Sequence, residues 1–346
     1  MLKDLNMGTW YSWLICAALF VVGIIFLVKF SDLFVSAASS IAKKFHISPL
    51  IIGLTIVAMG TSLPELAVSA SDSVTCLIKG GNANVAIGNV VGSNIANLLL
   101  ILGFCALFSP ICVKKSVCKK EFPILIFVSL ILSLFGILFS LNGQYAVLRW
   151  EAIILVVLII VYMIYIVFDA KKEKQSFSLQ EEKDNIKVMA TWKAIIFVII
   201  GIAGIVLGGE AVVYGAKNIA IGIGDVAKLN HDLVESLVGL TIVAIGTSLP
   251  ELVTSIVAAK KGEADMALGN VIGSNIFNVL FVLGISGIIS PLTVGSQIIV
   301  DLIMMMLATI LVFVFALKGK LGKKEGFILI IFYFVYLAYL VLRTLI

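Results

Sequence analysis

Long apolar segments recur along the whole chain, at a length that suits a lipid bilayer. The plainest are 11–30, 121–141, 146–168, 192–208, 295–317 and 325–342. A helix needs about 20 mainly apolar residues to cross a membrane. Charged residues are only 13% of the 346 residues, whereas soluble domains carry about 25%. The chain is therefore predicted to be an all-α membrane protein, because helices satisfy their own backbone hydrogen bonds within lipid.

Two sequence blocks occur twice. Gly53–Leu66 (GLTIVAMGTSLPEL) and Gly239–Leu252 (GLTIVAIGTSLPEL) match at thirteen of fourteen positions. Gly88–Asn97 (GNVVGSNIAN) and Gly269–Asn278 (GNVIGSNIFN) match at eight of ten. The chain is therefore interpreted as a duplicated unit. The predicted division is a first repeat over 1–169, a linker over 170–191 and a second repeat over 192–346.

Each repeat is predicted to contain five helices. The ten expected helices are 11–42, 49–78, 83–108, 121–141, 146–169, 192–222, 232–259, 264–289, 295–317 and 325–344. Lysines in alternate connections between them account for 18 of the 25 basic residues. The positive-inside rule makes these connections cytoplasmic, including the 170–191 linker, and leaves both termini outside. Because five is odd, the second repeat starts from the opposite side of the cell membrane, an inverted arrangement typical of multi-pass secondary transporters.

An acidic residue lies near the middle of one expected helix in each repeat. Glu65 lies in 49–78, and Glu251 lies in 232–259. A charged side chain at that depth costs at least about 2.5 kcal/mol, so it usually marks an ion pathway. Pro64 and Pro250 precede the two glutamates and each remove one backbone donor, which predicts a break in the helix.

Neutral oxygen atoms accompany both carboxylates. Hydroxyl and amide groups lie within one turn of the predicted breaks or in the second duplicated block; they are Thr61, Ser62, Ser93, Asn97, Thr247, Ser248, Ser274 and Asn278. Oxygen ligands without thiolate or imidazole favour hard cations, and Ca²⁺ takes six to eight of them. Glycines in the second block are expected to let helices approach closely; they are Gly88, Gly92, Gly269 and Gly273.

Other classes of function lack the residues they need. A serine hydrolase needs a base beside its nucleophile, but the only histidines, His46 and His231, fall at the ends of expected helices. We therefore expect no enzymatic activity and no cofactor. No basic run is interleaved with aromatic residues, which argues against nucleic acid as a partner. A passive channel is disfavoured because inverted repeats around a central site are typical of alternating access.

The duplicated motifs resemble those of a known transporter family. GTSLPEL at 60–66 and 246–252, each followed by a GN–GSN block, is similar to the two alpha-repeats of the sodium/calcium exchangers within the cation/calcium antiporter superfamily. The short linker resembles that of prokaryotic members. The resemblance implies an antiporter that exchanges sodium for calcium by alternating access, with electrogenic calcium export. It implies calcium, sodium and the lipid bilayer as partners. The repeat pair is itself expected to be able to work as a monomer.

The resemblance also assigns ligands. It implies that Glu65 and Glu251 bind calcium with the backbone carbonyls of Thr61 and Thr247. For sodium it implies the carbonyls of Ala58 and Ala244 and the hydroxyls of Ser62, Ser93, Ser248 and Ser274. Asn97 and Asn278 would line the central position, and the first and sixth helices would slide across the cluster.

One position departs from part of the family. Some members, including potassium-dependent exchangers, carry Asp where this chain has Asn278. The third carboxylate is missing here, which puts potassium coupling in doubt. A proton/calcium antiporter is the alternative, because buried glutamates also relay protons. Calcium uptake driven by a sodium gradient or by a pH gradient separates the two readings.

Overall fold

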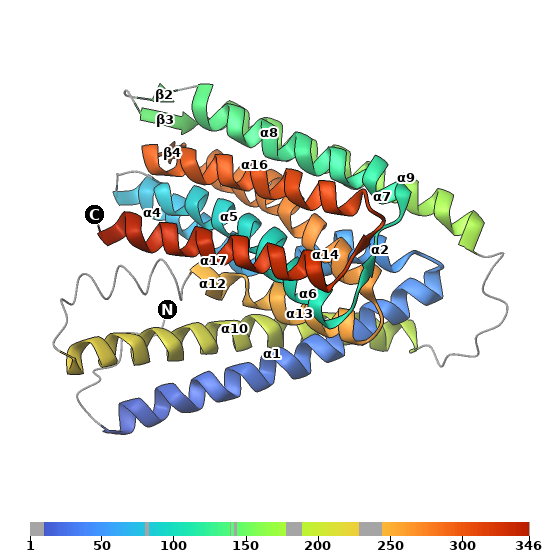
Figure 1. The fold of residues 1–346 in the computed structure, drawn as a ribbon, viewed down its shortest axis with the longest axis horizontal. Helices are drawn as coiled ribbons and strands as arrows, with labels where there is room; N and C mark the ends of the chain where they lie inside the picture. Colours follow the sequence, from blue (N-terminus) through green and yellow to red (C-terminus); the bar gives the residue numbers. More distant parts are fainter. Residues whose placement is uncertain are drawn as a thin grey trace.

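The computed structural model describes residues 10–79, 83–138, 140–141, 144–177, 189–227 and 244–345, and these are mostly helical (Figure 1). The first half contains α1 (Trp10–Phe45), α2 (Pro49–Ile52), η1 (Gly53–Val57), α3 (Ala58–Thr61), α4 (Leu63–Lys79), α5 (Asn84–Ala96), η2 (Asn97–Ile101), α6 (Leu102–Phe108), β1 (Ile111–Cys112), α7 (Lys115–Lys119), α8 (Glu121–Leu138), β2 (Ser140–Leu141), β3 (Gln144–Val147) and α9 (Arg149–Phe177). The second half contains α10 (Thr191–Val226), α12 (Ala244–Thr247), α13 (Leu249–Lys260), α14 (Ala264–Phe277), η4 (Asn278–Val282), α15 (Leu283–Ile289), β4 (Leu292–Val294), α16 (Ser296–Ala316), β5 (Lys320–Leu321) and α17 (Lys323–Leu345).

Most of the predicted spans are present as helices. Among the described residues, eight helices are long and apolar enough to cross a membrane, and a bent pair over 49–79 raises the number to nine. The expected helix 232–259 lies partly outside the described residues, and its described part is α12 and α13. The membrane-protein prediction is confirmed at this level.

The helices that carry the two glutamates are interrupted next to them. Pro49–Thr61 and Leu63–Lys79 meet at Ser62 with a bend of 45°. In the second half, α12 ends at Thr247 and α13 begins at Leu249, so Ser248 lies at the equivalent break. The predicted breaks before the proline–glutamate pairs are therefore present. Each follows from a proline that cannot donate to the preceding turn.

Two spans form the centre of the molecule. In the most apolar part of Val85–Phe108 83% of the residues are buried, and for Ala264–Ile289 the figure is 78%. In the other spans that are single helices, 22–39% of the residues in the most apolar part are buried. Strongly buried helices lie between protein neighbours, and the others face lipid on much of their surface. The duplicated GN–GSN blocks thus belong to the two central helices, α5 and α14.

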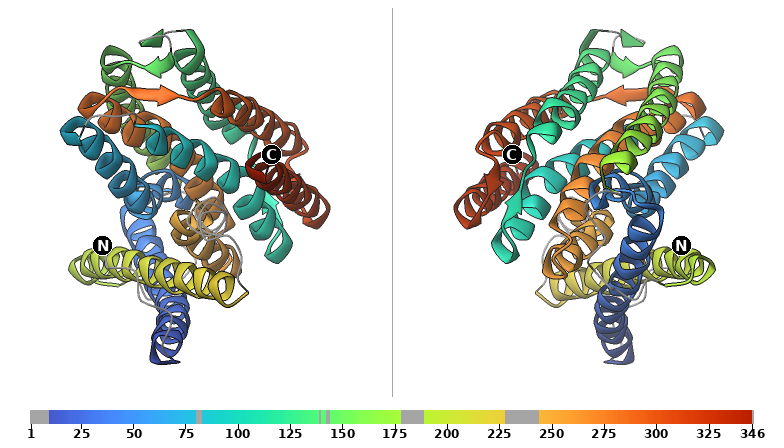
Figure 2. Two further views of the ribbon diagram at one scale, coloured as in Figure 1. Left: turned by 90° about the vertical axis from the view of Figure 1, so that its left-hand side faces the viewer. Right: turned by 90° about the vertical axis from the view of Figure 1, so that its right-hand side faces the viewer.

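Long helices α1 and α10 pack closely against each other along one side of this centre (Figures 1 and 2). Glycines bring the two backbones together: a Cβ atom added at Gly23 would lie 2.8 Å from the Gly208 carbonyl oxygen. Small residues of this kind are typical of close helix contacts in membranes.

Short strands pair the connections on each side of the helices. β1 pairs with β5 (Ile111 opposite Leu321), and β3 pairs with β4 (Tyr145 opposite Val294). The first pair joins two lysine-rich connections, and the second joins two connections with few lysines. The pairing agrees with the predicted alternation of sides.

The glycine prediction is confirmed for the second repeat. A Cβ atom added at Gly269 would lie 2.3 Å from the Leu50 carbonyl oxygen, and one at Gly273 would lie 2.8 Å from Cα of Leu54. Among the described residues, nothing lies within 4 Å of a Cβ atom added at Gly88 or Gly92. Their close-packing role stays a prediction, because the segment equivalent to Leu50 lies outside the described residues.

Gly269→Ala is expected to destabilise the protein, because the added methyl group would push α14 away from the Leu50 backbone. Overpacking of this kind costs about 1–3 kcal/mol. Thermal unfolding of the purified protein in detergent measures the effect. Gly295→Ala is the matched control, since its added Cβ meets nothing within 4 Å and its φ of −64° suits alanine. Equal unfolding temperatures for the two variants would contradict this packing.

Candidate functional site

Both glutamates are completely buried at the centre of the molecule. Glu65 lies in the first turn of α4 and Glu251 in the first turn of α13, each with 0% exposure. They are close enough to repel each other electrostatically. No lysine or arginine forms a described ion pair with either one. A pair of buried carboxylates without a cationic side chain is expensive unless another positive charge is supplied.

Hydroxyl groups surround the two carboxylates. Ser62 donates to Oε1 of Glu251 at 3.3 Å, which links the two halves of the chain. Ser93 donates to Oε1 of Glu65 at 3.4 Å and lies 3.5 Å from the Thr247 hydroxyl. These distances are long for hydroxyl–carboxylate bonds, which are usually about 2.5–2.7 Å. The hydroxyl groups therefore lie beside the carboxylates without forming short hydrogen bonds to them.

The remaining predicted residues belong to the same region. The Thr61 hydroxyl lies 3.5 Å from that of Ser274. Asn278 donates to Oδ1 of Asn94 at 3.1 Å. The Ala58 carbonyl accepts a hydrogen bond from the Ser62 amide at 3.0 Å.

Two predicted residues are buried with polar atoms that bond to no described residue. They are Asn97, at both side-chain atoms, and Ser248, at its hydroxyl oxygen. Ala244 begins α12, and nothing further is described of its side chain.

Each central helix changes its winding at a predicted ligand. The π-helical turns η2 and η4 begin at Asn97 and Asn278. A π-helical turn is rare and is often found at a functional site, because it shifts side chains and carbonyl groups out of the regular pattern. A third π-helical turn, η1, lies directly before Ala58.

Unpaired buried oxygen atoms concentrate at this cluster. Oε2 of Glu65, Oε2 of Glu251 and Oδ1 of Asn278 have no hydrogen-bond partner among the described residues. Buried polar atoms are normally bonded, so an unpaired group calls for an ion or a water molecule. No group of three or more His, Cys, Asp or Glu side chains that could bind a metal occurs among the described residues. A cation here would therefore bind two carboxylates together with neutral oxygen atoms.

Four further polar residues lie in the cluster that the sequence analysis did not single out. They are Asn89, Asn270, Ser69 and Ser255. Asn89 accepts from the Thr247 hydroxyl at 3.3 Å, and Asn270 accepts from the Thr61 hydroxyl at 3.2 Å. All four occur at equivalent positions of the two repeats, so the duplication itself was the signal that could have found them.

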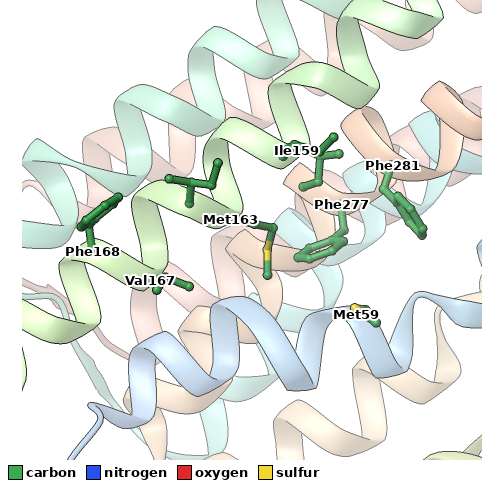
Figure 3. A pocket seen from close by; sticks show the side chains of 9 residues that line it. Met59, Ile159, Met163, Val167, Phe168, Phe277 and Phe281 are labelled. Carbon is green, nitrogen blue, oxygen red and sulfur yellow. The ribbon is translucent and has the colours of Figure 1, made fainter.

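An apolar pocket of about 490 Å³ lies next to the site but is not part of it (Figure 3). Met59, Met163 and Phe277 are among its lining residues, and no polar side chain lines it. Met59 precedes Gly60 and Thr61 in the broken helix. The pocket lacks the oxygen atoms that a hard cation needs, so the candidate site is the buried cluster and not the pocket.

Comparison with known proteins points to one group of transporters. A family model described as sodium/calcium exchanger protein matches residues 15–168 and 193–342. The sodium/calcium exchanger MaX1 of Methanosarcina acetivorans is 34% identical over 349 residues, covering 92% of this chain and 96% of that protein. The inner membrane protein YrbG of Escherichia coli is 38% identical over 287 residues, covering 80% and 81%. A structure of the sodium-calcium exchanger NCX_Mj soaked with Na⁺ and Sr²⁺ is 31% identical, with a TM-score of 0.77 over 94% of this chain and 98% of that one.

Proposed function

Because the chain belongs to the sodium/calcium exchanger protein family, we propose that it exchanges sodium for calcium across the cell membrane by alternating access. The family makes it a membrane antiporter for calcium and another cation. The observation that carries the choice of ions is the buried pair Glu65 and Glu251, each at a helix break and each surrounded by neutral oxygen atoms. Two carboxylates balance one Ca²⁺ or two Na⁺ ions.

The proposed ligands are those that the family resemblance implies. Glu65 and Glu251 bind calcium, together with the backbone carbonyls of Thr61 and Thr247. Sodium ions take the neutral oxygen atoms around them, which are the carbonyls of Ala58 and Ala244 and the hydroxyls of Ser62, Ser93, Ser248 and Ser274. Asn97 and Asn278 line the central position. The unpaired Oε2 atoms of both glutamates support this assignment, because an ion would satisfy them.

The proposed architecture is ten helices in two inverted repeats, 1–169 and 192–346, joined by a cytoplasmic linker over 170–191. The two separate ranges matched by the family model, 15–168 and 193–342, support this division. The matching helix breaks at Ser62 and Ser248 support it as well. The repeat pair contains a complete ligand set, so we propose that a monomer is sufficient, without enzymatic activity or a cofactor.

The pair α1 and α10 is the proposed moving element. The two helices pack against each other, and much of their outer surface is exposed, which leaves them free to shift in lipid. α1 also contacts α13 and the residue that follows it through polar side chains. The hydroxyls of Ser31 and Thr254 lie 3.1 Å apart, and Lys261, directly after α13, lies 2.7 Å from Asp32. These contacts would have to break if the pair slides past the site toward the other state.

Glu65→Gln and Glu251→Gln are each expected to abolish calcium transport without preventing folding. Either change lowers the site charge from −2 to −1 and leaves a divalent ion poorly compensated in a low-dielectric interior. Radioactive calcium flux in proteoliposomes measures the effect. Glu325→Gln is the control, because that carboxylate bonds instead to Lys318 and to the Gly322 amide. Normal calcium flux in either site variant would refute the ligand assignment.

Labelling is expected to place the 170–191 linker in the cytoplasm and the β3 connection outside. The reason is the concentration of lysines in alternate connections. Ser176→Cys and Tyr145→Cys, each in a variant without the five native cysteines, would be treated with a membrane-impermeant thiol reagent in oriented vesicles. Tyr145 is 43% exposed, so a cysteine there can react. Labelling of the Ser176→Cys variant only from the outside would reverse the proposed orientation.

The exchange is expected to move net charge and to need no potassium. Asn278 leaves the cluster with two fixed negative charges, and three sodium ions exchanged for one calcium carry a net charge of +1. Membrane potential then biases transport by about 2.3 kcal/mol per 100 mV, and an inside-negative potential favours calcium export. Flux at clamped potential, with and without potassium, is the measurement, with Asn278→Asp for comparison. A wild-type rate that ignores potential argues against three-for-one exchange, and one that requires potassium argues against this role of Asn278.

Proton/calcium antiport is the second candidate, and the unpaired Oε2 atoms of Glu65 and Glu251 also favour it, since each could carry a proton. The hydroxyl-rich surroundings favour sodium instead, because a proton needs no set of neutral oxygen ligands. Uptake that follows an imposed sodium gradient at constant pH supports sodium exchange. Uptake that follows only a pH gradient supports the proton antiporter.

A further inference from the structure

We propose that Asn89 and Asn270 are positioning residues that hold the calcium ligands of the two halves in register. This inference rests on the proposed function. Each asparagine joins the glutamate helix of its own half to the threonine at the helix break of the other half. Neither one is assigned as an ion ligand.

The bonds of Asn270 connect α13 to α3. Its Nδ2 donates to the Ser255 hydroxyl at 2.8 Å, and its Oδ1 accepts from the Thr61 hydroxyl at 3.2 Å. Ser255 lies four residues after Glu251, so the two side chains lie on the same face of α13, one helical turn apart. Thr61 is the last residue of α3. One amide group therefore fixes the Thr61 break relative to the Glu251 helix.

The bonds of Asn89 connect α4 to α12 in the same manner. Its Nδ2 donates to the Ser69 hydroxyl at 3.1 Å and lies 3.4 Å from the Glu65 carbonyl oxygen. Its Oδ1 accepts from the Thr247 hydroxyl at 3.3 Å. Ser69 lies four residues after Glu65, and Thr247 is the last residue of α12. The same arrangement thus occurs twice at equivalent positions, with donor and acceptor in the same roles.

Asparagine is suited to this task because its amide group has both an acceptor and two donors. Aspartate would provide no donor and would add a charge beside the ions. Asn270 is 1% exposed, and Ser255 and Thr61 are fully buried. A polar group without a protein partner at this place could therefore not form a hydrogen bond to bulk water instead.

Preorganised ligands bind more tightly because less ordering is needed when the ion enters. We call the Asn270–Thr61 contact and the Asn89–Thr247 contact the two brackets. If either bracket is lost, the backbone carbonyl of its threonine is free to shift away from the calcium position. A purely structural polar contact predicts something else: lower stability with unchanged calcium affinity. The two explanations therefore differ in a measurable quantity.

A double-mutant cycle on equilibrium binding of radioactive calcium to the purified protein tests the bracket. Thr61→Val keeps the shape and the backbone carbonyl but removes the hydroxyl, and Asn270→Ala removes the amide. Each is expected to weaken calcium binding about tenfold, equivalent to about 1.4 kcal/mol. The double variant is expected to bind no more weakly than either single one, because the same contact is already lost.

Thr61→Val combined with Asn89→Ala is the matched control, since these residues belong to different brackets; their losses should multiply to about a hundredfold, because independent free-energy losses add. Thr61→Ser keeps the hydroxyl that donates to Asn270 and should bind calcium more tightly than Thr61→Val. If Asn270→Ala does not fold, the contrast between Thr61→Val and Thr61→Ser still decides the matter. Unchanged calcium affinity in Thr61→Val, or multiplying losses for Thr61 and Asn270, would overturn the bracket. Absence of calcium binding by the wild type would instead reject the proposed function.

Discussion

Two carboxylates buried at the centre of a membrane protein are the constraint on which the rest of the structure depends. Glu65 and Glu251 repel each other, and no described ion pair neutralises them. A charge in a low-dielectric interior is tolerated only where another charge or well-placed dipoles compensate it. The helix breaks, the hydroxyl groups and the two central helices all serve that compensation. In the proposed cycle the missing positive charge is the transported ion, so the stability of the empty site and the affinity for ions have the same origin.

The duplication explains how one chain builds such a site. Each half supplies one glutamate at a proline-induced break and one central helix with an asparagine at the start of a π-helical turn, Asn97 or Asn278. Side chains of one half then bond to the other, as Ser62 does with Glu251 and Thr247 with Asn89. Neither half alone contains the whole proposed ligand set. This interdependence keeps the two halves together while α1 and α10, which pack through glycines, remain a separate pair.

Much of this could be predicted from the sequence, because apolar length, lysine distribution and proline positions act locally. The spans and both helix breaks follow from such local rules. The π-helical turns could not be predicted, since one extra residue in a turn hardly changes the apolar pattern. The contacts of Asn89 and Asn270 were also missed, because a neutral side chain gives no sign of its partner across the molecule. Likewise, the Ser62 hydroxyl bonds to Glu251, whereas the Ser248 hydroxyl has no partner among the described residues, although the two motifs are almost identical. Such differences arise from packing and not from the local sequence.

The most direct test of the account is the position of a bound divalent ion. Crystals of the protein soaked in calcium or strontium would be measured for anomalous scattering, which locates the ion independently of the protein atoms. We expect one divalent peak shared by the carboxylates of Glu65 and Glu251, with the backbone oxygens of Thr61 and Thr247 in its coordination shell. A divalent ion that contacts neither glutamate, or only one of them, would contradict it.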